Sequence, residues 1–250
     1  MNQNLVSIIT PSYNSERFIS DTINSVIEQT YDNWELIIVD DASYDQTPKI
    51  IKRFLSKESR IKAIFLKENI GPSEARNQAI RIAKGRFIAF LDSDDLWLPN
   101  KLDAQINYMI TNSVGFSFTS YIQISEDGLN HLKEIHAPAR INYNSYLKNT
   151  IIGCLTVVLD KRIVGDFEMP KIRSSHDMAL WLIILKQGFV AHGIDITLAK
   201  YRLVSTSNTA NKLKSMYDVW RVYRDFEKLN LIFSLYNFIN YIYNAIKKRL

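Results

Sequence analysis

Residues 84–102, KGRFIAFLDSDDLWLPNKL, join an apolar run to a dense acidic cluster. The run over 86–91 is predicted to be a buried β-strand, and it ends directly in Asp92-Ser93-Asp94-Asp95. Three carboxylates so close together repel one another unless a cation neutralises them. Because Mg²⁺ and Mn²⁺ prefer oxygen ligands and bridge carboxylates to phosphates, the cluster indicates a divalent metal site. The alternative is a solvated turn that caps a helix beginning near Pro99.

Upstream of this cluster, strand and helix patterns alternate. Short apolar runs predict strands, and apolar residues at three- to four-residue spacing predict helices. The predicted strands are 6–10, 35–39, 61–66 and 86–91, and the predicted helices are 15–29, 46–55 and 71–83. This alternation is typical of βαβ units, so we expect an α/β fold with a largely parallel central sheet.

Polar side chains also follow the first two predicted strands. Pro11 and Tyr13 come directly after the strand over 6–10, and Asp40 and Asp41 follow the next strand. Ligands of parallel α/β sheets bind beyond the carboxyl ends of the strands, so these residues are candidates for one site. The Asp41 carboxylate can accept hydrogen bonds from a nucleotide base or ribose, or it can cap the next helix.

Two further residues carry chemistry that suits such a site. Arg76 lies near the start of the third predicted helix, and its planar guanidinium suits a diphosphate or a base. Its alternative role is a surface ion pair with Glu74 or Asp92. Asp177 precedes an apolar helix, where it can act as a general base or interact with the helix dipole.

After residue 100 the pattern becomes less regular. The expected elements are a helix over 99–111, a strand over 114–124, a loop or hairpin over 128–139, a strand over 151–159 and a helix over 177–186.

The C-terminal segment 229–245 is rich in Leu, Ile, Phe and Tyr, but polar residues recur every three or four positions. On a helix they form a polar stripe, which consists of Asn230, Ser234, Asn237, Asn240 and Asn244. Lys247, Lys248 and Arg249 follow. An amphipathic helix with a basic end is typical of one that lies in a membrane interface. The alternative is a helix packed on its own domain or in a dimer interface.

Composition and missing motifs exclude several classes of protein. The chain has 250 residues, of which 46% are hydrophobic, and this suits a globular domain. A single cysteine, Cys154, excludes an intrachain disulfide and favours a reducing compartment. We expect no signal peptide and no spanning helix. Dinucleotide, P-loop, zinc-protease and serine-hydrolase motifs are absent from the sequence.

The net charge of +5 is mildly basic and compatible with a phosphorylated substrate or an anionic lipid surface. Because the basic residues are scattered rather than arranged in stripes, we expect no nucleic-acid partner.

Taken in order, four of these motifs resemble glycosyltransferase family 2. They are VSIITPSYN at 6–14, VDDAS at 39–43, NIGPSEARNQAI at 69–80 and the stretch at 84–102. The resemblance covers roughly residues 4–112 and resumes at 175–188, where HDMALWLIILKQG is similar to the family's acidic-pair segment. It implies a GT-A fold, in which helices flank a Rossmann-like, mostly parallel sheet. The residue pattern adds a C-terminal amphipathic helical tail to this α/β fold.

The resemblance also implies roles for individual residues. Pro11, Tyr13 and Ser93 would belong to the nucleotide-sugar site, Asp41 would bind the base, and Arg76 would lie near the nucleotide. Asp92 and Asp94 form the D-x-D element for Mn²⁺ or Mg²⁺, with Asp94 as the direct ligand. Asp177 would be the catalytic base. The family often has Glu where His176 stands, which affects the acceptor contacts.

The implied reaction is an inverting transfer. A single base at the acceptor hydroxyl gives one displacement, so an α-linked donor yields a β-glycoside. The enzyme would be a hexosyltransferase or an N-acetylhexosaminyltransferase that uses a UDP-sugar. The short chain and basic C-terminus resemble bacterial enzymes that build O-antigen, capsule or teichuronic-type polymers on lipid-linked oligosaccharides. We therefore expect a cytoplasmic protein, peripheral at the inner face of the plasma membrane.

This interpretation divides the chain into three parts. Residues 1–112 would bind the nucleotide sugar, residues 113–205 would bind the acceptor within the same catalytic domain, and residues 206–250 would form a tail that contacts the membrane or a second copy in a homodimer. Two other functions are alternatives at this point: a metal-dependent nucleotidyltransferase and a non-catalytic sugar-nucleotide-binding protein.

Overall fold

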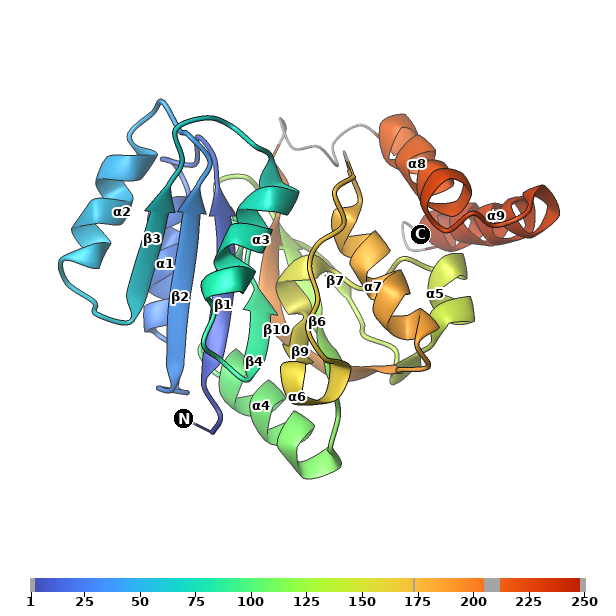
Figure 1. Ribbon diagram of the computed structural model, residues 1–250, viewed down its shortest axis with the longest axis horizontal. Coiled ribbons are helices and arrows are strands. Elements are labelled where there is room, and N and C mark those ends of the chain that lie inside the picture. The colour runs from blue at the N-terminus through green and yellow to red at the C-terminus, as the bar shows by residue number, and fades with distance from the viewer. Residues whose placement is uncertain (1–2, 173, 205–211, 248–250) are drawn as a thin grey trace.

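The computed structural model describes residues 3–172, 174–204 and 212–247 (Figure 1). Within these ranges, one ten-stranded sheet has the strand order β3-β2-β1-β4-β9-β6-β10-β5, with β7 paired to β6 and β8 paired to β10. Helices cover both faces of the sheet. Side chains of α1, α2 and α4 form one buried apolar cluster, and side chains of α3, α5 and α7 belong to the other.

The first half of the sheet is parallel, as the alternating pattern predicts. Its strands pair in parallel along the order β3-β2-β1-β4. The elements are β1 (Val6–Ser12), α1 (Ile19–Ile27), β2 (Trp34–Asp40), α2 (Thr47–Leu55), β3 (Ile61–Phe65), α3 (Pro72–Ile82) and β4 (Phe87–Phe90). Every residue of β1, β2 and β4 is buried, because helices cover the sheet on both sides. The apolar runs of the sequence therefore mark these strands clearly.

The second half of the sheet is mixed. It contains β5 (Leu96–Trp97), α4 (Lys101–Asn112), β6 (Phe116–Ile124), β7 (His131–Ile135), β8 (Arg140–Ile141), α5 (Tyr143–Lys148), η1 (Cys154–Thr156), β9 (Val158–Asp160), α6 (Lys161–Val164), α7 (His176–Lys186) and β10 (Ala191–Arg202). The short strand β9 runs antiparallel between β4 and β6, whereas β10 runs parallel to β6. The helix, strand and hairpin predicted between 99 and 139 are confirmed.

The strand predicted over 151–159 is wrong for most of its length. Only Val158–Asp160 is a strand, and Cys154–Thr156 forms a 3₁₀ turn. Side chains donate hydrogen bonds to the backbone carbonyls that, in a strand, would accept hydrogen bonds from a neighbouring strand. Thr156 Oγ1 donates to the carbonyl of Gly153 at 2.6 Å, and Trp97 Nε1 donates to that of Leu155 at 2.8 Å.

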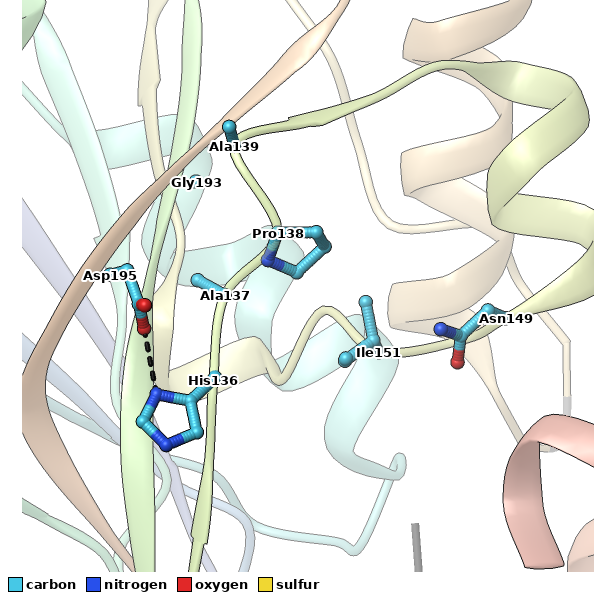
Figure 2. A pocket seen from close by; sticks show the side chains of 8 residues that line it. All are labelled: His136, Ala137, Pro138, Ala139, Asn149, Ile151, Gly193 and Asp195. Atoms are coloured by element: carbon cyan, nitrogen blue, oxygen red, sulfur yellow. Dashed lines mark hydrogen bonds and ion pairs between the residues drawn. The ribbon is translucent and has the colours of Figure 1, made fainter. Parts of the chain in front are cut away.

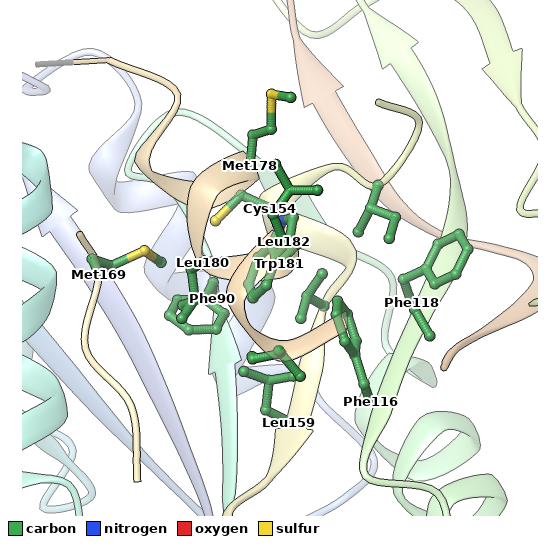
Figure 3. Close-up of a cluster of buried hydrophobic side chains, with 14 of the residues drawn as sticks. Phe90, Phe116, Phe118, Cys154, Leu159, Met169, Met178, Leu180, Trp181 and Leu182 are labelled. Carbon is green, nitrogen blue, oxygen red and sulfur yellow. The ribbon is translucent and has the colours of Figure 1, made fainter. Parts of the chain in front are cut away.

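Two aromatic contacts join the two halves of the sheet. The ring of Trp181 on α7 packs against Phe90 of β4 at 5.5 Å and against Phe116 of β6 at 5.2 Å, between ring centroids. Figure 3 shows this cluster, in which Trp181 lies at the centre of buried side chains from both halves. These contacts fix where the N-terminus of α7 lies relative to the end of β4.

The chain ends in three helical segments, α8 (Lys212–Arg221), the π-helical turn η2 (Val222–Phe226) and α9 (Leu231–Lys247). Glu227 attaches them to the domain, because its buried carboxylate accepts hydrogen bonds from Tyr143 Oη at 2.5 Å and Lys186 Nζ at 2.9 Å. The helix predicted over 229–245 is confirmed, and two residues of its polar stripe, Ser234 and Asn237, are buried against the protein. Among the described helices, none is long and apolar enough to cross a membrane.

Candidate active site

The carboxyl ends of β1, β2 and β4 lie at one edge of the sheet. The parallel register pairs Ser12 with Asp40 and Ile9 with Phe90. Pro11, Asp41 and Asp92 therefore gather at this edge, although they are far apart in the sequence. The edge is where parallel α/β sheets bind their ligands.

Asp41 stabilises the backbone of the loop that leads into α3. Its buried carboxylate accepts backbone hydrogen bonds from Ile70 at 2.7 Å and Gly71 at 2.9 Å. Gly71 has φ +87, a conformation that favours glycine and begins the helix that carries Arg76. Because a carboxylate accepts about four hydrogen bonds, Asp41 retains capacity for a donor on a base.

The neighbouring Asp40 is the second carboxylate that the sequence places at this strand end. Its Oδ2 accepts a hydrogen bond from the backbone N–H of Ser43 at 3.2 Å, while its buried Oδ1 has no partner among the described residues. Burial raises the pKa of this carboxyl. An unpaired buried acceptor at a strand end suits a ligand donor.

Two tyrosines form an exposed aromatic pair at the same edge. The ring of Tyr13 meets Tyr44 edge-to-face with the centroids 6.2 Å apart, and Tyr44 is 85% exposed. Exposed aromatic rings can stack on a base. Tyr44 was not predicted, because a lone tyrosine among polar residues reads as an ordinary loop.

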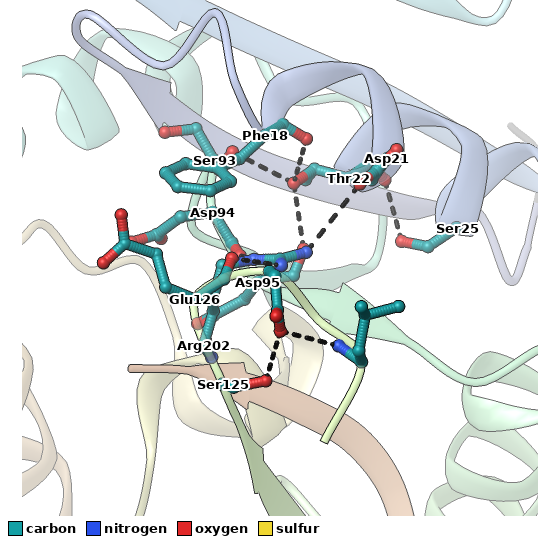
Figure 4. A network of polar contacts seen from close by, with 12 residues as sticks. Phe18, Asp21, Thr22, Ser25, Ser93, Asp94, Asp95, Ser125, Glu126 and Arg202 are labelled. Carbon is teal, nitrogen blue, oxygen red and sulfur yellow. Dashed lines mark hydrogen bonds and ion pairs between the residues drawn. The ribbon is translucent and has the colours of Figure 1, made fainter. Parts of the chain in front are cut away.

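The acidic turn at 92–95 is held by two side chains from distant elements (Figure 4). Thr22 Oγ1 donates to the carbonyls of Ser93 at 3.0 Å and Asp95 at 2.9 Å. Arg202, at the end of β10, donates from Nε to the carbonyl of Asp94 at 2.8 Å and from its backbone N–H to Asp95 Oδ1 at 2.9 Å. Asp95 is therefore part of the scaffold of the turn.

The alternative role as a helix cap is wrong for this cluster. Helix α4 begins at Lys101 after Asn100, and no side chain caps it. Burial and the Asp92 carboxylate raise the pKa of Asp94 to about 6. No side chain of the described residues donates a hydrogen bond to the Asp94 carboxylate, so its oxygens remain available.

These carboxylates fit a hard divalent cation that also binds a substrate. Asp92 and Asp94 offer crowded oxygen donors whose mutual repulsion a cation would relieve. The described residues contain no group of three or more His, Cys, Asp or Glu side chains that could hold a metal by themselves. Phosphate oxygens and water would complete the coordination, as is usual for Mg²⁺.

Arg76 joins the acidic turn to α7. It is only 5% exposed, and it pairs with Asp92 through Nη2 and with Nε2 of His176 through Nη1 at 2.6 Å. Burial lowers the pKa of this arginine, but Asp92 in particular more than offsets that effect. The sequence also suggested that Arg76 forms a surface ion pair with Asp92. This ion pair is present, but it belongs to a buried bridge and not to the surface.

His176 is a neutral acceptor in this bridge. An arginine only donates hydrogen bonds, so Nε2 of His176 carries no proton and Nδ1 carries it. Burial and the Arg76 cation lower the pKa of His176 to about 4. The buried Nδ1 has no partner among the described residues and is available as a donor.

Asp177 lies in the first turn of α7, directly after His176. It is close enough to Arg76 and to the buried thiol of Cys154 to raise the pKa of both groups. Trp181, one turn later, packs on Phe90, which comes two residues before Asp92. Packing thus sets the spacing between the acidic turn and Asp177.

No recognisable signal in the sequence indicates that Cys154, Thr22 and Arg202 belong to this site.

An open groove of about 510 Å³ lies on the second half of the sheet (Figure 2). Asp195 accepts hydrogen bonds there from His136 Nδ1 at 2.9 Å and Ser120 Oγ at 2.7 Å. The lining also includes Asn149 and Ile151, on the segment that leads to Cys154. Its carboxylate, imidazole and amide groups suit a hydroxyl-rich ligand.

Known proteins resemble this chain over nearly its whole length. The family model for glycosyl transferase family 2 matches residues 7–162. The putative teichuronic acid biosynthesis glycosyltransferase TuaG of Bacillus subtilis is 47% identical over 98% of both chains. WfgD of Escherichia coli, a UDP-Glc:alpha-D-GlcNAc-diphosphoundecaprenol beta-1,3-glucosyltransferase, is 43% identical over 99% of this chain and 96% of its own.

Solved structures share the fold. The mannosyltransferase PcManGT from Pyrobaculum calidifontis, in complex with GDP-Man and Mn²⁺, superposes with a TM-score of 0.70 at 19% identity. The match covers 90% of this chain and 64% of that longer chain.

Proposed function

The chain belongs to glycosyltransferase family 2, and we propose that it transfers a sugar from a UDP-sugar to a hydroxyl of a lipid-linked oligosaccharide in bacterial surface polysaccharide synthesis. Its fold is the GT-A fold that the sequence motifs implied. The family is inverting, so an α-linked donor gives a β-glycoside. This membership leaves no support for a nucleotidyltransferase or a non-catalytic binding protein.

One observation carries the proposal. The buried bridge from Asp92 through Arg76 to His176 places the acidic turn beside the N-terminus of α7, where Asp177 stands. A sugar transferase needs a site for the donor diphosphate next to a base for the acceptor hydroxyl. The bridge supports this arrangement, because it links Arg76 to His176 across 100 positions of the sequence.

We assign residues 1–112 to the donor. Tyr13 and Pro11 would line the base pocket, Asp41 would accept a hydrogen bond from uracil, and Ser93 would lie beside the sugar diphosphate. Asp94, with Asp92, would hold Mn²⁺ or Mg²⁺. When bound, this cation neutralises the charge that develops on the departing diphosphate. The Arg76 cation would stabilise the same negative charge on the departing diphosphate.

We assign residues 113–205 to the acceptor. Asp177 would take the proton of the attacking hydroxyl as that oxygen bonds to the anomeric carbon and the nucleoside diphosphate leaves. The unpaired Nδ1–H of His176 would donate to an acceptor or donor oxygen. The groove lined by His136 and Asp195 offers polar partners for the next sugar of the acceptor.

A lipid-linked acceptor places the reaction at a membrane. WfgD is named for an acceptor of this kind. We therefore propose that the protein works at the cytoplasmic face of the plasma membrane without spanning it. The segment 206–250 is the contact, with the bilayer or with a second copy in a homodimer.

The test is a transfer assay with purified protein and a synthetic GlcNAc-diphospho-lipid. UDP-Glc, UDP-GlcNAc and GDP-Man are compared in Mn²⁺, in Mg²⁺ and in excess chelator. We expect product with a UDP-sugar and metal, and a β-linkage by NMR. Full activity in chelator would overturn the metal assignment. Pyrophosphate release from UTP and a sugar phosphate, without transfer from any donor, would overturn the proposed function.

A further inference from the structure

Helix α9 buries polar residues against the protein and exposes several of its large apolar residues. Ser234 and Asn237 are completely buried, whereas Ile232 is 82% exposed, Ile239 64% and Tyr243 66%. A surface helix of a soluble domain normally shows the opposite arrangement. The sequence alone does not determine which side of an amphipathic helix faces the protein.

The inward polar residues donate hydrogen bonds to backbone carbonyls. Ser234 Oγ donates to the carbonyl of Asn230 at 2.8 Å, and Asn237 Nδ2 donates to that of Phe233 at 2.8 Å. Asn244 Nδ2 donates across to the carbonyl of Lys148, at the end of α5, at 3.0 Å. The first two hydrogen bonds lie within the segment itself, so the orientation of α9 depends on the Asn244 contact and on packing against α5.

Aromatic packing fixes the same side. Phe238 meets Trp220 of α8 edge-to-face at 5.3 Å and stacks on Tyr241 at 6.0 Å, between ring centroids. Both Phe238 and Tyr241 pack against the main apolar core.

The outward residues form one continuous apolar stripe, which we call the outer stripe. It consists of Ile232, Leu235, Tyr236, Ile239, Tyr243 and Ile246, all of them exposed. Their spacing of three or four residues places them on one face of the helix. In Figure 1, α9 lies at the edge of the molecule beyond α5. An exposed apolar surface of this kind indicates a contact with another apolar phase.

Positive charge surrounds the outer stripe. Lys148 Nζ lies 5.0 Å from the centroid of the Tyr236 ring, and exposed Lys228 and Lys247 stand before and at the end of the helix. The sequence from 228 to 250 contains no Asp or Glu, and it includes Lys248 and Arg249. A second copy of the chain would bring the same cations to the contact, whereas anionic lipid headgroups would neutralise them. Tyrosines are also enriched at membrane interfaces.

We propose that the outer stripe docks in the headgroup region of an anionic bilayer, with Lys148, Lys228 and Lys247 against lipid phosphates. The proposal rests on the proposed function for its biological reason, because a lipid-linked acceptor is presented at that surface. The apolar side chains enter the boundary of the acyl chains, and the helix lies parallel to the membrane.

Helix α5 connects this surface to the catalytic residues. It packs against both α9 and α7, the helix that carries Asp177. Lys148 contacts the outer stripe, and Tyr146, two residues earlier, is buried in the same apolar core as the side chains of α7. One short helix thus spans the distance between the docking surface and the base. Docking would hold Asp177 at a fixed height above the headgroups, within reach of the first sugars of the acceptor.

Flotation of the full chain with vesicles tests the proposal. Vesicles of 30% phosphatidylglycerol in phosphatidylcholine are compared with pure phosphatidylcholine. The variant Ile232→Gln/Ile239→Gln/Ile246→Gln should lose more than tenfold in affinity for the anionic vesicles. The matched control, Leu129→Gln/Ile196→Gln, removes exposed apolar residues elsewhere and should bind normally. Lys148→Gln and Lys247→Gln should each cost about fivefold on anionic vesicles only.

Two further measurements separate the outcomes. The wild type and the triple variant should transfer sugar equally well to a short water-soluble acceptor. If neither protein transfers sugar to either acceptor, the proposed function is wrong. Light scattering gives the oligomeric state. Docking is overturned if the wild-type protein ignores anionic vesicles at low salt. It is also overturned if the wild type is a dimer that the triple substitution dissociates.

Discussion

Replacement of Arg76 by lysine isolates the geometry of the buried bridge from its charge. Arg76 is almost fully buried, and its two terminal nitrogens contact Asp92 and His176 at the same time. Lysine keeps a cation in the site, but its single ammonium group cannot reproduce the planar fork. One of the two contacts should therefore be lost in Arg76→Lys.

The size of the effect follows from the contact that is lost. A hydrogen bond to a charged group contributes about 1.5–3 kcal/mol, which corresponds to about 10- to 150-fold in kcat/KM if the contact acts in the transition state. Loss of the Asp92 contact would weaken metal and diphosphate binding. Loss of the His176 contact would free the first turn of α7 and move Asp177.

The assay is kcat/KM for transfer at saturating metal, together with urea unfolding of each variant. The matched control is Arg81→Lys on the same helix, because Arg81 pairs with Glu74 and Glu168 at the surface. We expect the control to keep wild-type activity, since exposed ion pairs contribute little. The reasoning is refuted if Arg76→Lys retains activity within threefold of the wild type while remaining folded.

Three further changes test other parts of the structure. Asp94→Ala should abolish transfer and weaken the Mn²⁺-dependent binding of UDP measured by calorimetry, while leaving the unfolding midpoint nearly unchanged. Asp41→Ala should cost about 1–3 kcal/mol in urea unfolding and weaken UDP binding, because the backbone N–H groups of Ile70 and Gly71 lose their acceptor. Burial lowers the pKa of Lys101 to about 7. Between pH 7 and pH 10 the unfolded chain therefore holds a proton that the folded chain lacks. Because of this difference, the free energy of unfolding should rise with pH. Lys101→Met, which has no group that titrates in this range, should flatten that rise in urea titrations.

The parallel half of the sheet could be predicted because its strands are buried on both faces. Continuous apolar runs such as 36–39 are typical of strands that helices cover on both faces. The strand β10 shows why the second half was harder. Its pairing with β6 shifts register between Ile194 and Ala199, and these irregularities break the alternation that marks a half-buried strand.

The site could be predicted as far as its carboxylates. Acidic residues at strand ends are visible in the sequence, whereas their partners are not. Arg76 and His176 are separated by a hundred positions, and Arg202 reaches the acidic turn from the strand that was missed. The orientation of α9 was equally hidden, because it depends on the hydrogen bond from Asn244 to Lys148 and on packing against α5.

The central claim is that Asp177 removes the proton of the acceptor hydroxyl while other residues bind the donor. The direct measurement compares wild type and Asp177→Asn by calorimetry with a UDP-sugar in Mn²⁺ and by single-turnover transfer. The amide keeps the size of the side chain but cannot accept the proton. We predict donor affinity within about twofold of wild type and a transfer rate lower by about 10² or more. An unchanged transfer rate from bound donor, or a collapse of donor affinity, would contradict the claim.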